Sequence, residues 1–164
     1  MTQPQDDKTR RLFRDALGRF TTGVAVVSSA PAGFEPLGLT VNSFSSVSLE
    51  PPLVLWCVDK QSDTLPAFTV ATHFAVNILK SHHEHLSVKL SRIGNHGLEG
   101  LNFTNGKHGS PVLEDAFAWF DCKVHARDEA GDHIIIIGHV LDFGMSAGGV
   151  PLVYHAGDYQ ELAP

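Results

Sequence analysis

The feature that most restricts the fold is an alternation near the C-terminus, followed by a run of four isoleucines. Between residues 118 and 126 the even positions are Ala, Phe, Cys, Val and Ala, and the odd ones are Trp119, Asp121, Lys123 and His125. This period of two predicts a strand with one face in the core. After a charged turn at 127–132, the isoleucines at 134–137 are apolar on both faces. That strand must be covered on both sides, as in a closed barrel or a sheet that meets a partner subunit.

Other short apolar runs, separated by turn residues, indicate more strands. They cover residues 24–29, 37–40, 53–58 and 74–79. The stretch 30–36, with two prolines and a glycine, suits a hairpin loop between the first two runs. Strands therefore follow strands without a regular alternation with helices, which favours a mainly β, antiparallel barrel over a parallel sheet.

Helical signals are few. Five apolar side chains share one side of an N-terminal helix that should end near Gly23; they are Leu12, Phe13, Ala16, Leu17 and Phe20. Their spacing leaves Arg10, Arg14 and Arg19 turned largely to solvent. Short helices are also expected within residues 62–68 and 82–90.

Length and charge exclude several classes of protein. With 164 residues and no evident linker, the chain is predicted to be one domain, with residues 1–11 as a flexible tail. A formal net charge of −6 without a basic cluster argues against nucleic acid as a partner. No apolar run approaches the roughly 20 residues that span a bilayer, and MTQPQDDKTRR is not typical of a secretory signal. We therefore expect a soluble cytoplasmic protein without a membrane partner, with Cys57 and Cys122 as reduced, buried thiols.

The common catalytic motifs are absent. The sequence contains no GxGxxG after a strand, no GxxxxGK[ST], no GxSxG and no HExxH. Among the ten histidines, His82, His83 and His85 fan around a helix and do not share one face. The other histidines are scattered, and no Cys or carboxylate accompanies them at ligand spacing, so no metal site is predicted.

Two segments carry distinctive chemistry. TVNSFSSVS, residues 40–48, packs five hydroxyls and one amide into nine positions before Pro51 and Pro52. Such neutral donors could hold a phosphate, a polyol chain or a polar ring edge, although a Ser-rich loop can also satisfy its own backbone. GDH, residues 131–133, places His133 at a strand start, where it could position a ligand or simply follow a hairpin turn.

Together and in order, these segments resemble the flavin reductase family, the small reductase components of two-component, flavin-dependent monooxygenases. The matching stretches are residues 13–24, 38–54, 74–79, 109–113, 131–140, 151–154 and 157–159. The resemblance implies a split β-barrel of the Greek-key, FMN-binding type that works as a homodimer. It also implies hydride transfer from NADH, with NADPH as the alternative donor, to FMN or FAD, and delivery of reduced flavin to a separate monooxygenase.

Site residues follow from the same resemblance. His133 would lie where the nicotinamide enters, as a positioning donor. Residues of the hydroxyl-rich segment, of the next strand end and of two further positions would bind the cofactors; they are Thr40, Asn42, Ser43, Ser45, Ser46, Ser48, Cys57, Val58, Asp59, Lys60, Ser62 and Tyr154.

One departure concerns the short helix near residue 86. Family members usually carry Phe-Ala after its Leu-Ser, whereas here Leu86-Ser87-Val88-Lys89 continues to Leu90-Ser91. The choice between FAD and FMN is therefore open, with Lys89 as an alternative phosphate contact. A non-catalytic flavin or haem carrier on the same fold, a histidine-based metalloenzyme and a flavoenzyme that keeps its oxygen chemistry on this chain remain alternatives.

Overall fold

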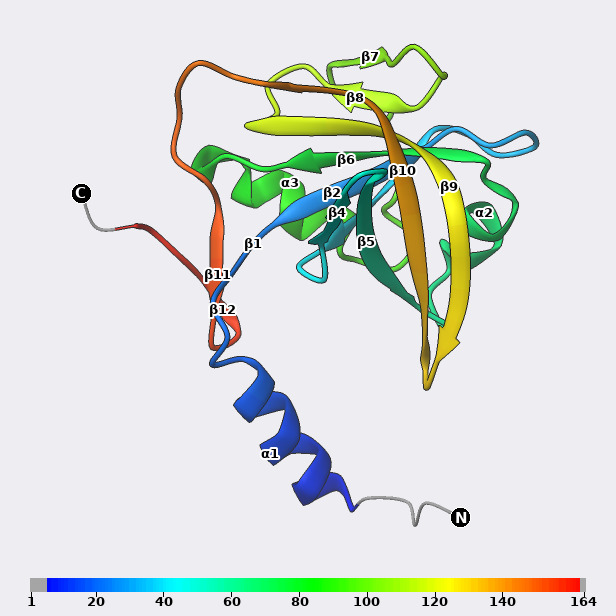
Figure 1. Ribbon diagram of the computed structural model, residues 1–164. Helices are drawn as coiled ribbons and strands as arrows, with labels where there is room; N and C mark the ends of the chain where they lie inside the picture. Colours follow the sequence, from blue (N-terminus) through cyan, green and yellow to red (C-terminus); the bar gives the residue numbers. More distant parts are fainter. Residues whose placement is uncertain (1–5, 163–164) are drawn as a thin grey trace.

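The computed structural model describes residues 6–162 and is built around one seven-stranded antiparallel sheet (Figure 1). The strand order is β3-β2-β6-β9-β10-β5-β4. The bounds of these strands are β2 Ala25–Ser29, β3 Leu37–Val41, β4 Ser45–Leu49, β5 Pro52–Asp59, β6 His73–Ile78, β9 Ala118–Ala130 and β10 His133–Met145. The two edge strands, β3 and β4, are not paired with one another, so the sheet curves as a split barrel and does not close. The predicted fold class is confirmed.

Smaller elements surround this sheet. A three-stranded sheet has the order β1-β11-β12, with β1 Thr22–Gly23, β11 Val153–His155 and β12 Asp158–Gln160, and β7 Phe103–Asn105 pairs with β8 Pro111–Leu113. The helices are α1 Asp7–Leu17, α2 Leu65–Val70 and α3 Glu84–Leu90, the last preceded by a 3-10 turn, η1 Ser81–His83. Within the described residues, no helix combines the length and apolar character needed to cross a bilayer.

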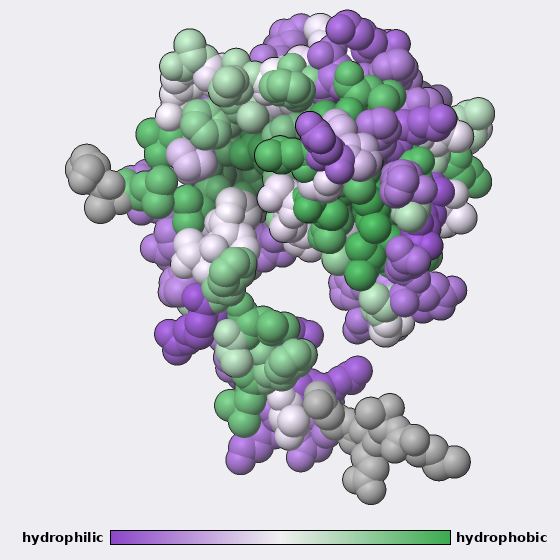
Figure 2. Space-filling view, in the orientation of Figure 1, coloured by the Kyte–Doolittle hydropathy of each residue, from purple (hydrophilic) through white to green (hydrophobic). Residues whose placement is uncertain are grey.

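The predicted N-terminal helix forms, but it begins earlier and ends earlier than expected. Asp6 caps it by accepting a hydrogen bond from the Thr9 amide at 2.6 Å, and Gly18 follows its last turn. Residues 7–11, predicted to belong to an N-terminal tail, are helical here, while residues 1–5 lie outside the described range. None of the helix residues is buried, and Leu12, Phe13 and Leu17 are each 59% exposed. The apolar side of α1 is thus not covered by this chain (Figure 2).

The β9–β10 hairpin is longer than the sequence suggested. Residues 127–130, expected in a charged turn, extend β9, and only Gly131 and Asp132 separate the two strands. Gly131 has a φ of 64°, a conformation that glycine adopts without strain. Charged residues here can continue a strand because this end of the hairpin extends into solvent, where both faces of the strand are hydrated.

Two groups of buried side chains stabilise the fold on opposite faces of the sheet. The first contains Trp56, whose ring meets Phe68 and Phe74 edge-on at 4.8 and 5.9 Å between centroids. The second is formed by Leu79, Leu90 and other side chains beneath α3. In the isoleucine run Ile136 is buried, whereas Ile134, Ile135 and Ile137 are half-buried. Within this chain the run is therefore only partly covered.

Candidate functional site

The linker between β3 and β4 begins the candidate site. It consists of Asn42, Ser43 and Phe44, and it carries the chain from one edge of the sheet to the other. The Ser43 hydroxyl oxygen accepts a hydrogen bond from the Cys57 amide at 3.0 Å, and the Cys57 carbonyl lies 3.4 Å away. The backbone pairing of β4 with β5 ends at Ser45 and Leu55. Beyond that pair, the Ser43 side chain takes the place of a strand neighbour and binds the β5 backbone at Cys57.

The serines of β4 lie on the outermost strand of the sheet. Ser45 and Ser46 are exposed and Ser48 is half-buried. The Ser45 hydroxyl donates to the Ser46 carbonyl at 3.2 Å. Among residues 6–162, the hydroxyls of Ser46 and Ser48 have no hydrogen-bond partner. These two hydroxyl groups can therefore donate hydrogen bonds to a ligand. In a Ser-rich loop that satisfies its own backbone, they would already be used.

The end of β5 and the start of β10 form a second part of the site. His133 pairs with Asp59 and Ile135 with Cys57 across this ladder. The His133 Nδ1–H donates to Asp132 at 2.8 Å, and Lys60 forms an ion pair with Glu129 at 2.8 Å. The hydrogen bond from His133, with a smaller effect of the Arg10 charge, holds the pKa of Asp132 below its ordinary value. The other ring nitrogen of His133 has no partner among the described residues.

Three predicted site residues at or just after the end of β5 differ in the groups with which they could contact a ligand. The Val58 side chain is fully buried in the core, so only its backbone could reach a ligand. Burial raises the pKa of the Cys57 thiol, although the Ser43 hydrogen bond acts in the opposite direction. The Ser62 hydroxyl shares a hydrogen bond of 2.8 Å with Thr64. Cys57 therefore stays a neutral thiol near neutral pH and is poorly suited to act as a nucleophile.

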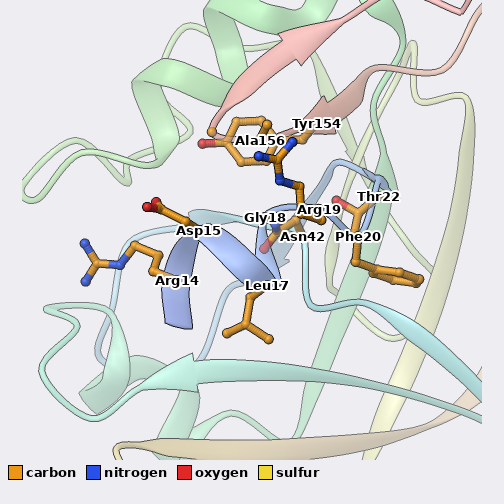
Figure 3. Close-up of a pocket in the computed structure, with 11 residues that line it drawn as sticks. Arg14, Asp15, Leu17, Gly18, Arg19, Phe20, Thr22, Asn42, Tyr154 and Ala156 are labelled. Atoms are coloured by element: carbon orange, nitrogen blue, oxygen red, sulfur yellow. The ribbon is translucent and has the colours of Figure 1, made fainter. Parts of the chain in front are cut away.

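A cavity of about 630 Å³ lies between α1, the linker and β11 (Figure 3). Asn42 and Tyr154, both predicted site residues, line it, and Figure 3 shows Tyr154 and Ala156 across from Leu17 of α1. Neither the Asn42 amide nor the Tyr154 hydroxyl has a hydrogen-bond partner within the described chain. The remaining lining residues are Arg14, Asp15, Gly18, Arg19, Phe20, Thr22 and Gly157.

A smaller cavity, of about 210 Å³, adjoins the first through Asn42 and Tyr154. Hydroxyl groups dominate its wall: Thr40 donates to the Ser87 carbonyl at 2.8 Å, and the Ser87 hydroxyl lies 2.7 Å from that of Tyr159. Ser87 belongs to α3, which also carries Lys89. Lys89 is half-buried but does not line this cavity.

Helix α1 forms one wall of the large cavity. Arg14 lines this cavity, and Arg10 lies one helical turn earlier on the same face of the helix. Figure 2 shows an opening between α1 and the main body, with apolar surface along both walls. Of the predicted site residues, Thr40, Asn42 and Tyr154 line these two cavities, whereas His133 stands at the start of β10 and lines neither.

The donor set of this opening fits a flavin nucleotide. Neutral hydroxyls and an amide without internal partners can bind a polar ring edge or a ribityl-phosphate without a strong acid or nucleophile. Sequence reasoning missed the lining residues from α1, and it missed Ser87, Ser91 and Tyr159. The spacing of the apolar residues predicts that Arg14 and Arg19 face solvent. Only the tertiary structure shows that they line a cavity.

The structure also gives His82 and His83 a carboxylate neighbour that the sequence did not reveal. Asp115 lies 2.8 Å from His82 and 3.6 Å from His83, and their ligand atoms fall within 4.8 Å of one another. However, Lys80 occupies the other Asp115 oxygen, and the Lys80 amide donates to Nδ1 of His83 at 3.3 Å. The neutral His83 ring therefore carries its proton on Nε2, which favours an ion-pair network over a metal site.

Comparisons with known proteins show the family of this chain. Residues 17–163 match the family described as the flavin reductase like domain. The FMN reductase (NADH) SmoA of Agrobacterium fabrum strain C58 is 45% identical over 150 residues, which cover 91% of this chain and 84% of SmoA. The reductase component of the flavin-dependent trigonelline monooxygenase of Acinetobacter baylyi is 40% identical over 149 residues. The matched region covers 91% of this chain and 48% of that protein.

Among solved structures, the NADH:FAD oxidoreductase SgcE6 of Streptomyces globisporus C-1027 superposes with a TM-score of 0.90. It is 32% identical, and the match covers 100% of this chain and 99% of SgcE6. SgcE6 has also been solved in complex with NAD and FAD fragments. With the sequence and the fold matched over nearly all of its length, this chain belongs to the flavin reductase family of oxidoreductases.

Proposed function

We propose that this chain transfers a hydride from NADH to a flavin, FMN or FAD, and supplies the reduced flavin to a separate monooxygenase. The observation that carries the proposal is a set of neutral donors without hydrogen-bond partners among residues 6–162: Asn42 and Tyr154 on the wall of the large cavity, and Ser46 and Ser48 on β4. SmoA, SgcE6 and the trigonelline monooxygenase reductase support it through the activities that their names describe.

The two bound nucleotides supply the redox chemistry, in which a hydride passes from nicotinamide C4 to flavin N5. The role of the protein is to position them, because the reacting atoms must come within about 3–3.5 Å. Ser46, Ser48 and Asn42 are assigned to the flavin. His133 is assigned to the nicotinamide side, where its free ring nitrogen can hydrogen-bond without acting as an obligatory proton carrier. Tyr154 and the wall of α1 would reduce the access of water.

The proposal includes a homodimer in the cytoplasm. Several large apolar side chains are exposed on α1 and on the second half of β10; they are Leu12, Phe13, Leu17, Leu141, Phe143 and Met145. Together with the half-buried isoleucines of β10, they give the chain more exposed apolar surface than monomeric proteins usually carry. A second copy of the chain would cover it. Light scattering of the purified protein would test this, and a monomeric mass at micromolar concentration would contradict it.

Steady-state kinetics test the activity. Purified protein is mixed with FMN or FAD and with NADH or NADPH, and absorbance near 340 nm is followed. We expect flavin-dependent loss of absorbance, faster with NADH than with NADPH. Flavin binding without nucleotide oxidation would instead identify a carrier, and neither binding nor oxidation would contradict the proposal altogether.

A further inference from the structure

The cations on the wall of the large cavity have no role in the function described so far. Arg14 and Arg19 both line this cavity, together with a single carboxylate, Asp15. Within residues 6–162, neither guanidinium forms an ion pair or a hydrogen bond with a side chain. By contrast, Lys60, Lys80 and Lys107 are each paired with a carboxylate at 2.9 Å or less.

Local charge sets this wall apart from the rest of the protein. Residues 6–19 carry five basic and three acidic side chains, whereas the whole chain has a formal net charge of −6. Helix α1 is therefore the positive side of an acidic protein. Both guanidinium groups are exposed and hydrated, and a cavity with two cations on its wall attracts an anion that enters it.

The position of these cations suggests which anion they bind. The cavity is shared with Asn42 and Tyr154, two predicted cofactor-binding residues on its wall. An arginine fork matches phosphate oxygens in pairs, and two forks match the two neighbouring phosphates of a dinucleotide. We propose that Arg14 and Arg19 form a binding site for the diphosphate of a dinucleotide that uses this opening. This inference rests on the proposed function, and both NADH and FAD contain such a group.

The test uses Arg14→Gln/Arg19→Gln, with Arg11→Gln as the matched control because Arg11 is on the same helix but does not line the cavity. Calorimetric titration with ADP-ribose, at low ionic strength, reports the nicotinamide source without any redox reaction. Fluorescence titrations with FAD and with FMN report the flavin source. We expect the double variant to bind at least one diphosphate ligand about tenfold or more weakly, while the control changes by less than twofold.

The source follows from the pattern of losses. A loss for ADP-ribose alone assigns the site to NADH, and a loss for FAD larger than for FMN assigns it to FAD. Arg14→Lys/Arg19→Lys, which retains both charges, should keep part of the lost affinity. Equal weakening in the Lys and Gln variants, or unchanged affinity for all three ligands, would overturn the inference. The activity of the wild-type protein distinguishes this failure from failure of the proposed function. If only the inference is wrong, the wild type still oxidises NADH when flavin is present; if the proposed function is wrong, the wild type does not.

Discussion

His133, the first residue of β10, pairs with Asp59, the last residue of β5. This pairing joins the end of one candidate ligand-binding strand to the start of another, 74 positions away in the numbering of the chain. It also places the imidazole next to the tip of the β9–β10 hairpin, where Gly131 and Asp132 separate the two strands. The predictions below follow from this arrangement and from the packing that supports it.

A substitution of His133 tests whether this residue positions the nicotinamide without contributing to flavin binding. His133→Ala should slow flavin reduction or raise the KM for NADH, while the Kd for flavin stays nearly unchanged. The reason is that His133 begins β10, whereas Asn42 and the β4 serines, which are assigned to the flavin, lie on other elements. Stopped-flow reduction and a flavin titration would measure both effects. His125→Ala, an exposed histidine of β9, is the control, and wild-type kinetics in the His133 variant would remove this residue from the site.

Removing two serines of β4 should weaken flavin binding. In Ser45→Ala/Ser46→Ala, each hydrogen bond lost to the flavin typically costs about 0.5–1.5 kcal/mol, which amounts to several-fold or more in Kd for the pair. Both residues are exposed, so the free energy of unfolding should change little. Ser146→Ala at the end of β10 serves as the control in a fluorescence titration, and an unaltered Kd would move the flavin site elsewhere.

The two cysteines should react differently with iodoacetamide. Burial raises the pKa of Cys122 to about 12, with Asp121 adding to the effect, so this thiol should be inert in the folded protein. Burial also raises the pKa of Cys57, but less of it is enclosed, so alkylation should be slow and faster at higher pH. Saturating FMN should slow it further if flavin covers the end of β5. Mass spectrometry with Cys57→Ser as the reference would measure this, and equal rates with and without FMN would contradict it.

Gly138 is required by packing, not by an unusual backbone angle. A Cβ at this position would overlap the ring of Phe74 and lie 3.0 Å from Cys122, in the middle of the sheet. Gly138→Ala should therefore lower the free energy of unfolding by about 1–3 kcal/mol. Gly148→Ala, where an added Cβ meets nothing within 4 Å, should be close to neutral. Urea denaturation would compare them, and equal midpoints for the two variants would show that the sheet can shift to accept the methyl group.

Acid should weaken the contact between Asp115 and η1. Hydrogen bonds from Lys80 and His82 lower the pKa of Asp115, so its contribution to stability is complete above the unfolded value of about 3.9 and is lost as the pH falls through the lower folded value. Between about pH 4 and pH 2, wild-type protein should lose more unfolding free energy than Asp115→Asn. Asp128→Asn, an exposed carboxylate without an ion pair among the described residues, should behave like the wild type. Parallel curves for wild type and Asp115→Asn would contradict the prediction.

The sequence determined the elements whose residues interact locally or repeat with a clear period. The alternation at 118–126, the isoleucine run and the Pro/Gly loop at 30–36 were enough to predict an antiparallel β fold, because alternation places side chains on opposite faces of a strand. The order of several family segments was enough to suggest the chemistry. Boundaries that depend on hydration, such as the start of α1 and the length of β9, were not predicted correctly.

Only the tertiary structure decided which distant residues share a site. Asp115 meets His82, Ser43 binds the backbone at Cys57, and Arg14 faces the same cavity as Tyr154, although each pair is separated in the sequence. Neither periodicity nor composition encodes such contacts, since they arise when curved sheets and loops bring remote segments together. For the same physical reason, the solvent-facing arginines of α1 could be recognised from their spacing, whereas the cavity that they line could not.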